Sequence, residues 1–136
     1  MVIKSSYSNI KIITNLEFAE KDLIINRLLA SADAFISDYS SAAVDFLNTD
    51  KPIAFTLDDM EEYQNSRGFV FDNIQEWLPG KEIFNFNDLC DFIKEIAGNI
   101  DSTKEKRQRI SEKMLKYKDN NNCKRICEAL NITLED

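Results

Sequence analysis

FISDYSSAAVDF, residues 35–46, is the most informative segment of this sequence. It opens with apolar residues, passes through the polar turn Asp38-Tyr39-Ser40-Ser41, and continues at once in a helical pattern. A buried strand that leads through hydroxyl-bearing residues into a helix can form an anion site from backbone N–H and side-chain hydroxyl groups. The stretch therefore predicts a strand-turn-helix unit with a phosphate-binding turn at its centre.

The segments around this unit predict a small parallel sheet. Strand-like runs are expected at residues 9–14, 34–37, 53–55 and 82–84, and apolar residues recur at helical spacing within 20–32, 43–47, 89–96, 110–117 and 123–130. Strands that alternate with helices indicate a parallel sheet with right-handed crossovers. The expected fold class is α/β, a small Rossmann-like sheet flanked by helices, in one domain over residues 1–136.

Four polar residues of the unit are candidate ligand contacts. Asp38, Ser40 and Ser41 belong to the turn, where hydroxyls and the first N–H groups of the helix can bind a diphosphate. The chain has three Gly, too few for a glycine-rich phosphate loop, so the serines would have to supply these contacts. Asp45 lies four residues after Ser41 on one helix face and would accept hydrogen bonds from ligand hydroxyls. The same residues also fit structural roles, namely a serine N-cap and a surface acid near a helix start.

A long irregular stretch, residues 58–80, follows the third expected strand. Connections of this length inside a compact domain are usually functional. Arg67 precedes Gly68 here; a guanidinium suits bidentate phosphate binding, and glycine lets the backbone approach a ligand closely. An exposed loop arginine without a ligand is the alternative.

Composition limits the partners. The net charge is −7 and the sequence pI is about 4.7, which disfavours nonspecific binding to nucleic acid and attraction to anionic lipid. Residues 104–109, KEKRQR, form a local basic run, and the neighbouring acids predict a solvated helix face for it.

Three cysteines and no histidine limit the chemistry. The odd cysteine number and the lack of a signal-peptide pattern suggest a reducing cytoplasm. We expect Cys90, Cys123 and Cys127 to be buried or half-buried thiols, with no metal site and no cofactor. Without histidine the chain has no imidazole base. The sequence contains no apolar run of ~18 residues, so no transmembrane helix is expected.

Residues 32–46, ADAFISDYSSAAVDF, resemble the ADxxITDYSSxxFDF signature of the CDP-glycerol glycerophosphotransferases, bacterial enzymes that prime or polymerise teichoic acid. The resemblance continues in order through residues 51–53, 61–63, 67–72 and 78–80, and ends in a closing helix at 124–126. Three departures are Ser37 for Thr, Val44 for an aromatic residue, and Asn120-Asn121 for Asp-Gly.

The resemblance implies a GT-B architecture of two Rossmann-like domains, with this chain as part of the C-terminal, nucleotide-donor-binding domain. Ser40, Ser41 and Asp45 match positions that contact CDP-glycerol, and Arg67 matches a motif residue without an assigned role. Family members are several times longer, and their histidines, including the proposed base, lie upstream. The chain is therefore expected to bind CDP-glycerol or a related CDP-alditol without turnover.

The missing half would contact the acceptor polymer, and the full-length relatives would associate with the inner face of the cell membrane. Two alternatives remain open at this point. The chain could be a non-catalytic interaction domain that forms a homo-oligomer, or a fragment of another nucleotide-sugar glycosyltransferase.

Overall fold

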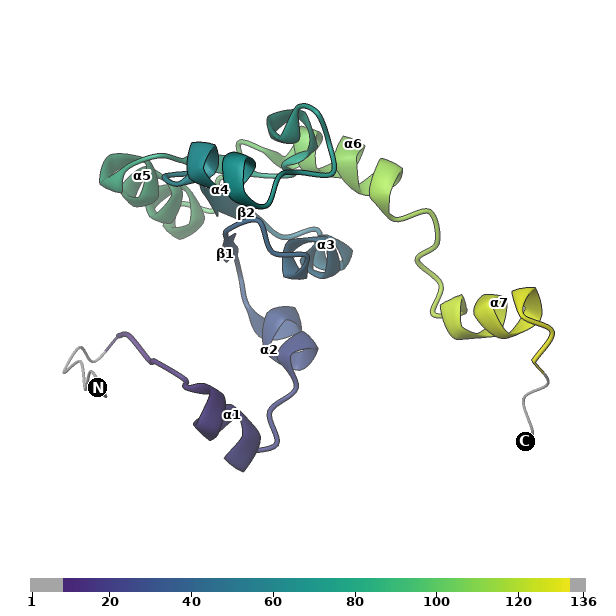
Figure 1. The fold of residues 1–136 in the computed structure, drawn as a ribbon. Helices are drawn as coiled ribbons and strands as arrows, with labels where there is room; N and C mark the ends of the chain where they lie inside the picture. Colours follow the sequence, from purple (N-terminus) through teal and green to yellow (C-terminus); the bar gives the residue numbers. More distant parts are fainter. Residues whose placement is uncertain (1–8, 133–136) are drawn as a thin grey trace. The chain divides into compact units, whose positions relative to one another are not determined.

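The computed structural model describes residues 9–132, and the chain divides into two compact units, residues 1–32 and 33–136. The first unit contains α1 (Asn15–Glu20) and α2 (Ile25–Ser31), and the second contains all the strands of the described chain (Figure 1). The single-domain organisation of residues 1–136 remains a prediction.

One expectation for the first unit is wrong and another holds in part. Residues 10–14 form no strand. The helix expected over 20–32 is present as α2 but begins only at Ile25, and α1 is a separate helix before it. A capping box starts α1 early: Thr14 Oγ1 accepts from Glu17 N at 3.2 Å, and Glu17 Oε2 accepts from Thr14 N at 3.1 Å. Asp22, with φ of 48°, then interrupts the helical path.

The second unit is built on a three-stranded parallel sheet in the order β1-β2-β3. The strands are β1 (Phe35–Ser37), β2 (Ile53–Thr56) and β3 (Lys81–Ile83), with Ser37 opposite Phe55 and Phe55 opposite Glu82. These strands agree within one residue with the runs expected at 34–37, 53–55 and 82–84. The α/β fold class with a small parallel sheet is confirmed.

Helices connect and flank the strands (Figure 1). α3 (Ala42–Phe46) and the 3-10 turn η1 (Leu47–Thr49) join β1 to β2, and α3 packs against β1. α5 (Phe86–Ala97) packs against β3 and ends at Gly98, and α6 (Lys104–Met114) contacts η1. The stretch 58–80 contains α4 (Met60–Ser66) and η2 (Ile74–Trp77), which the apolar pattern did not reveal.

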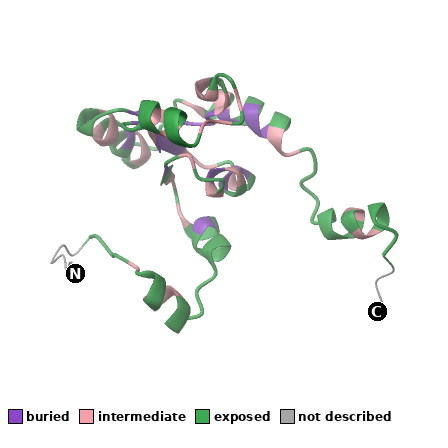
Figure 2. Cartoon of the chain, in the orientation of Figure 1, coloured by how far each residue is buried: buried purple, intermediate pink, exposed green. Residues whose placement is uncertain are grey.

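The core lies between β2 and the helices that pack on the sheet. Ile53 and Ala54 are fully buried, and buried residues concentrate in the strands, α3 and part of α6 (Figure 2). Phe46 is 1% exposed, and its ring lies 5.3 Å from that of Phe35. The apolar positions expected to share a helix face within 43–47 are all buried: Ala43 and Phe46 in α3, and Leu47 at the start of η1.

The C-terminal helix lies within one residue of the expected range, but one of its thiols differs from expectation. α7 (Asn122–Ala129) leaves Cys123 exposed, whereas Cys90 and Cys127 are half-buried, so the expectation of sequestered thiols is wrong for Cys123. Tyr117 lies beyond the end of α6 and is exposed, so it does not extend that helix's inner face. No helix in the described range 9–132 has the length and apolarity to span a bilayer.

Candidate functional site

The candidate site begins where β1 ends. Because the strands are parallel, their carboxyl ends meet at one edge of the sheet, the usual place for ligands in α/β folds. Thr56 Oγ1 donates to Ser37 O at 3.3 Å, which ties the ends of β1 and β2 together. The turn at residues 38–41 therefore starts from a strand end that is held in place.

Side chains of the turn hold its own backbone. Asp38 Oδ1 accepts from Ser40 N at 2.9 Å, and Ser40 Oγ accepts from Ala42 N at 3.3 Å. Ser41 occupies the N-cap position of α3 without a side-chain cap. Its hydroxyl is exposed and makes no hydrogen bond with any residue in the described part of the chain. Ser41 is thus the hydroxyl that remains free for a ligand.

A cavity of about 290 Å³ lies beside this turn. The turn forms its polar wall, and the stretch 68–79 forms most of the rest. Its lining comprises Asp38, Tyr39, Ser40, Ser41, Ala43, Val44, Phe55, Tyr63, Gly68, Phe69, Val70, Phe71, Ile74, Trp77, Leu78, Pro79 and Met114. The cavity is thus mostly apolar with polar groups gathered on one side, an arrangement typical of small-molecule sites.

Aromatic rings give this cavity its walls. The Tyr39, Tyr63 and Phe69 centroids lie 4.4 to 5.1 Å apart, and Phe71 stacks on Trp77 at 4.2 Å. Gly68 reverses the direction of the chain after α4, because glycine readily adopts its φ of 72°. The Gly68 N–H donates to Tyr63 O at 3.0 Å. The irregular stretch thereby packs against the serine turn.

The Tyr39 hydroxyl is buried without a hydrogen-bond partner. Burial raises the pKa of Tyr39 to about 12, and the carboxylates of Asp59, Asp58 and Asp38 add to the rise. Asp59 is close, yet no hydrogen bond of ordinary geometry joins it to the hydroxyl.

Replacement of Tyr39 by Phe should therefore keep or raise the free energy of unfolding at pH 7, by up to about 1 kcal/mol, because it removes an unsatisfied polar group. Between pH 10 and 12 the unfolded state releases a proton that the folded state keeps, so wild-type stability falls across that window. Urea denaturation of both proteins at pH 7 and across pH 10–12 should show a shallower decline for Tyr39→Phe. If Tyr39→Phe lowered the free energy of unfolding by more than about 1 kcal/mol at pH 7, the Tyr39 hydroxyl would have a hydrogen-bond partner after all.

The structure brings three of the five predicted site residues to the cavity. Asp38, Ser40 and Ser41 line it. Asp45 is exposed on α3 and outside the lining, and Arg67 is the exposed C-cap residue of α4, next to Gly68, which does line it. Ligand contacts of all five stay predictions. No group of three His, Cys, Asp or Glu residues within residues 9–132 could hold a metal ion.

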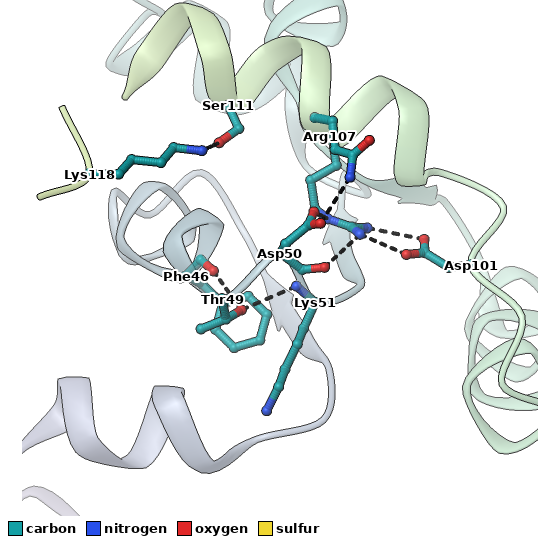
Figure 3. Close-up of polar contacts among 9 residues, drawn as sticks. Phe46, Thr49, Asp50, Lys51, Asp101, Arg107, Ser111 and Lys118 are labelled. Atoms are coloured by element: carbon teal, nitrogen blue, oxygen red, sulfur yellow. Dashed lines mark hydrogen bonds and ion pairs between the residues drawn. The ribbon is translucent and has the colours of Figure 1, made fainter. Parts of the chain in front are cut away.

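The most buried charged residue among those that the structure describes was not predicted from the sequence pattern. Arg107 is 1% exposed, although residues 104–109 were expected to form a solvated helix face, and that expectation is wrong at this position. Its guanidinium donates to Asp50 and Asp101 (Figure 3). Arg107, Ile110 and Met114 follow helical spacing, and this shared stripe was the available signal.

Comparisons with known proteins place the chain in a family. The family model for CDP-glycerol:poly(glycerophosphate) glycerophosphotransferases matches residues 3–131. A teichoic acid glycerol-phosphate primase of Bacillus spizizenii is 33% identical over 110 residues, 81% of this chain and 27% of that protein. A primase of the same description from Bacillus subtilis is 35% identical over 99 residues, 73% of this chain and 24% of that protein.

A third relative is the teichoic acid ribitol-phosphate polymerase TarK of Staphylococcus aureus, 31% identical over 106 residues, 78% of this chain and 20% of that protein. The chain thus spans between about a fifth and about a quarter of the length of these relatives. The family match covers both the serine turn and the stretch that closes the cavity. On this match, the chain belongs to the CDP-glycerol:poly(glycerophosphate) glycerophosphotransferase family.

Proposed function

We propose that this chain binds the CDP-alditol donor of an alditol-phosphate transferase in the cavity beside the serine turn. The observation that carries the proposal is the cavity's composition: an apolar, aromatic enclosure with Asp38, Ser40 and Ser41 gathered on one wall. An apolar enclosure suits the nucleoside part of such a donor, and the hydroxyls suit its diphosphate.

The polar residues in and near the turn would have different roles in binding the donor. Ser41 Oγ, which is free, would donate to a phosphate oxygen, while Asp38 would keep the turn in place through Ser40 N. Because α3 has five residues, its dipole is small, and hydroxyl and N–H contacts would supply most of the binding. Asp45, one turn after Ser41, would accept hydrogen bonds from alditol hydroxyls. Arg67, beside Gly68, would pair with a phosphate at the mouth of the cavity.

In the complete reaction an acceptor hydroxyl would attack the β-phosphate of the donor. The new bond would join the acceptor oxygen to that phosphorus, and the P–O bond to CMP would break. A base would take the acceptor proton. This chain has no histidine, so we place that base in the part of the relatives that the chain does not cover. We therefore expect the purified chain to bind donor without transfer.

Ser41→Ala is the sharpest test because Ser41 Oγ has no structural hydrogen bond to lose. Loss of one hydrogen bond to a charged phosphate costs about 1.5–3 kcal/mol, so the Kd for CDP-glycerol should rise at least about tenfold. Isothermal titration calorimetry of wild type and Ser41→Ala measures this. Ser40→Ala should weaken binding too, with a small loss of stability, because Ser40 Oγ accepts from Ala42 N.

Ser102→Ala is the control for loss of a serine hydroxyl, since Ser102 lies before α6 and does not line the cavity. Ser102 Oγ donates to Glu95 Oε2 at 2.7 Å, so this variant can lose stability but should keep the wild-type Kd. A panel of CDP-glycerol, CDP-ribitol, UDP-glucose and CMP identifies the donor class; ribitol is included because TarK is a ribitol-phosphate polymerase. Equal affinity of Ser41→Ala and wild type would remove the turn from the site. A stable dimer that binds no nucleotide would favour an interaction domain, and preference for UDP-glucose would favour another glycosyltransferase.

A further inference from the structure

Residues 104–118 are unusually cationic for this chain. Seven of these fifteen residues are Lys or Arg and two are Glu, whereas the whole chain has a net charge of −7. Such a concentration of charge on one helix and its C-terminal extension can attract an anionic partner to one place on an acidic protein. The structure sorts these cations by their surroundings.

Two of the cations are already neutralised by acids. Arg107 is buried between Asp50 and Asp101. Lys106 Nζ lies 3.2 Å from Glu82 Oε1. Neither residue therefore offers a full free charge to a ligand.

Arg109 and Lys113, four residues apart on α6, are exposed and have no acidic partner in the part of the chain that the structure describes. Both line a recess of about 530 Å³ between α6 and η2, the α6–η2 groove, with Gln75, Glu76, Trp77 and Lys106. Lys113 Nζ lies over the Trp77 ring, 5.3 Å from its centroid. Glu76 brings one carboxylate to the groove, and its Oε1 accepts from Asn73 Nδ2 at 2.8 Å.

We propose that the α6–η2 groove binds phosphate groups of an anionic alditol-phosphate chain. A phosphodiester presents two oxygens that share one negative charge, which fits the two-pronged donor fork of Arg109. Lys113 supplies a second cation one helical turn away, so that the two together suit a ligand with repeated phosphates. The Gln75 amide, whose Nε2 already donates to Glu82 Oε2 at 3.2 Å, borders the same recess.

The aromatic environment favours such a chain over a nucleic acid. The Trp77 indole is stacked by Phe71 at 4.2 Å with an interplanar angle of 10°, and Lys113 lies over the same ring. The indole is thus engaged already and offers no free platform for a base, on which single-stranded nucleic acid binding depends.

The position of the groove links it to the cavity beside the serine turn. Trp77 lines both recesses, and Met114 in the cavity follows Lys113 in the groove along α6. A chain held by Arg109 and Lys113 would therefore lie next to the bound donor. The identification of the ligand as the acceptor rests on the proposed function, whereas anion binding by the groove does not.

Trp77 is the single tryptophan of the chain, so its fluorescence reports on the groove. We expect a saturable fluorescence change when soluble poly(glycerol phosphate) is added to the purified chain, weakening as NaCl is raised. Calorimetry gives the same Kd without relying on the indole. Glycerol phosphate, a single-stranded RNA and anionic lipid vesicles are titrated in parallel, and each should bind at least about fivefold more weakly than the polymer.

The test variant is Arg109→Gln/Lys113→Gln, and Arg109→Gln alone leaves the Lys113–Trp77 contact intact. The polymer Kd should rise about fivefold in the double variant, because two exposed charge contacts of about 0.5 kcal/mol each together contribute about 1 kcal/mol. Lys104→Gln/Lys116→Gln removes the same net charge from the same segment outside the groove lining and should change the Kd less than twofold. Circular dichroism confirms that each variant is folded.

Absence of saturable polymer binding, equal loss in both double variants, or equal or tighter binding of RNA or vesicles would overturn the proposal. CDP-glycerol affinity is measured on the same proteins and should not change in Arg109→Gln/Lys113→Gln. If wild type binds polymer but no CDP-alditol, the donor proposal fails and the anionic groove stands. If wild type binds CDP-glycerol but no polymer, the groove proposal alone fails.

Discussion

Gly80→Ala is expected to destabilise the second unit by about 3 kcal/mol, at the upper end of the range for overpacking a core. A Cβ on Gly80 would lie 2.2 Å from Ile53 O and 2.7 Å from Ile53 C, far inside van der Waals contact. Both obstacles are backbone atoms, which cannot rotate away as a side chain can. The amino-terminal ends of β2 and β3 would have to separate.

The position of Gly80 in the sheet explains why the loss of stability is large. Gly80 is buried and immediately precedes β3. The register places Ala54 opposite Lys81, so Gly80 lies opposite Ile53 on the neighbouring strand. Leu78 and Pro79, just before it, line the cavity beside the serine turn. Displacement of Gly80 would therefore disturb the cavity wall as well as the sheet.

Urea denaturation followed by far-ultraviolet circular dichroism measures the effect, and the other two glycines are matched controls. Gly98→Ala would bring its Cβ no closer than 3.3 Å to another atom, and φ of −87° suits alanine, so a change within about 0.5 kcal/mol is expected. Gly68→Ala should cost about 1 kcal/mol because φ there is 72°. A Gly80→Ala protein as stable as Gly98→Ala would refute the close backbone contact.

The local pattern at residues 35–46 carried enough information to predict much of the second unit. Three apolar residues before a serine turn predicted β1, and apolar positions 43, 46 and 47 predicted the buried face of α3 and the start of η1. These features depend on neighbouring residues alone. The expected strand at residues 9–14 failed because alternating isoleucines satisfy a strand pattern without any neighbouring strand to pair with.

The cavity itself could not be predicted from local sequence. It exists because Gly68 turns the chain and brings Phe69 and Phe71 against a turn nearly thirty residues earlier. The sequence did single out residues 58–80 by their length and Arg67-Gly68, but not the aromatic packing that closes the space. Likewise, a charged residue on an apolar helix stripe is ambiguous until its partners, here 57 and 6 residues away, are known.

Arg107→Ala is the second large expected effect, with a loss of about 3 kcal/mol in the free energy of unfolding. Arg107 Nη2 donates to Asp50 O at 2.7 Å and to Asp101 Oδ2 at 2.7 Å, and Nη1 donates to Asp101 Oδ1 at 3.0 Å (Figure 3). Nε donates to Asp50 Oδ1 at 3.1 Å. Asp50 is 51% exposed and can regain water, so the loss stays at the lower end for a broken buried ion pair.

This network fixes the connection that leads from α3 into β2. Asp50 adopts φ of 51° at the end of η1, a conformation that costs energy for a residue other than glycine. Arg107 binds both the carbonyl and the carboxylate of Asp50, and Gln108 Nε2 donates to the second carboxylate oxygen at 2.9 Å. The guanidinium therefore stabilises a strained backbone at the amino-terminal end of β2, opposite the candidate site.

The charge state of the network sets its pH dependence. Burial opposes the charge on Arg107, but hydrogen bonds with Asp101 and Asp50 raise its pKa above the ordinary value. Burial likewise opposes ionisation of Asp50, whereas hydrogen bonds from Gln108 and Arg107 lower its pKa overall. Below about pH 4 the unfolded chain binds a proton at Asp50 that the folded chain resists, so this stabilisation is present at neutral pH and is lost on acidification.

Two further variants separate charge from packing. Arg107→Met keeps most of the buried volume, so its loss, expected at about 1–2 kcal/mol, reports the missing hydrogen bonds. Arg109→Ala, two residues on and exposed, should stay within about 0.5 kcal/mol of wild type. Urea denaturation at pH 7 and pH 3 should show that wild type loses more stability on acidification than Arg107→Met does. Equal acid sensitivity would mean that Asp50 is not held ionised by Arg107, and the network would then stabilise the β2 connection through packing alone.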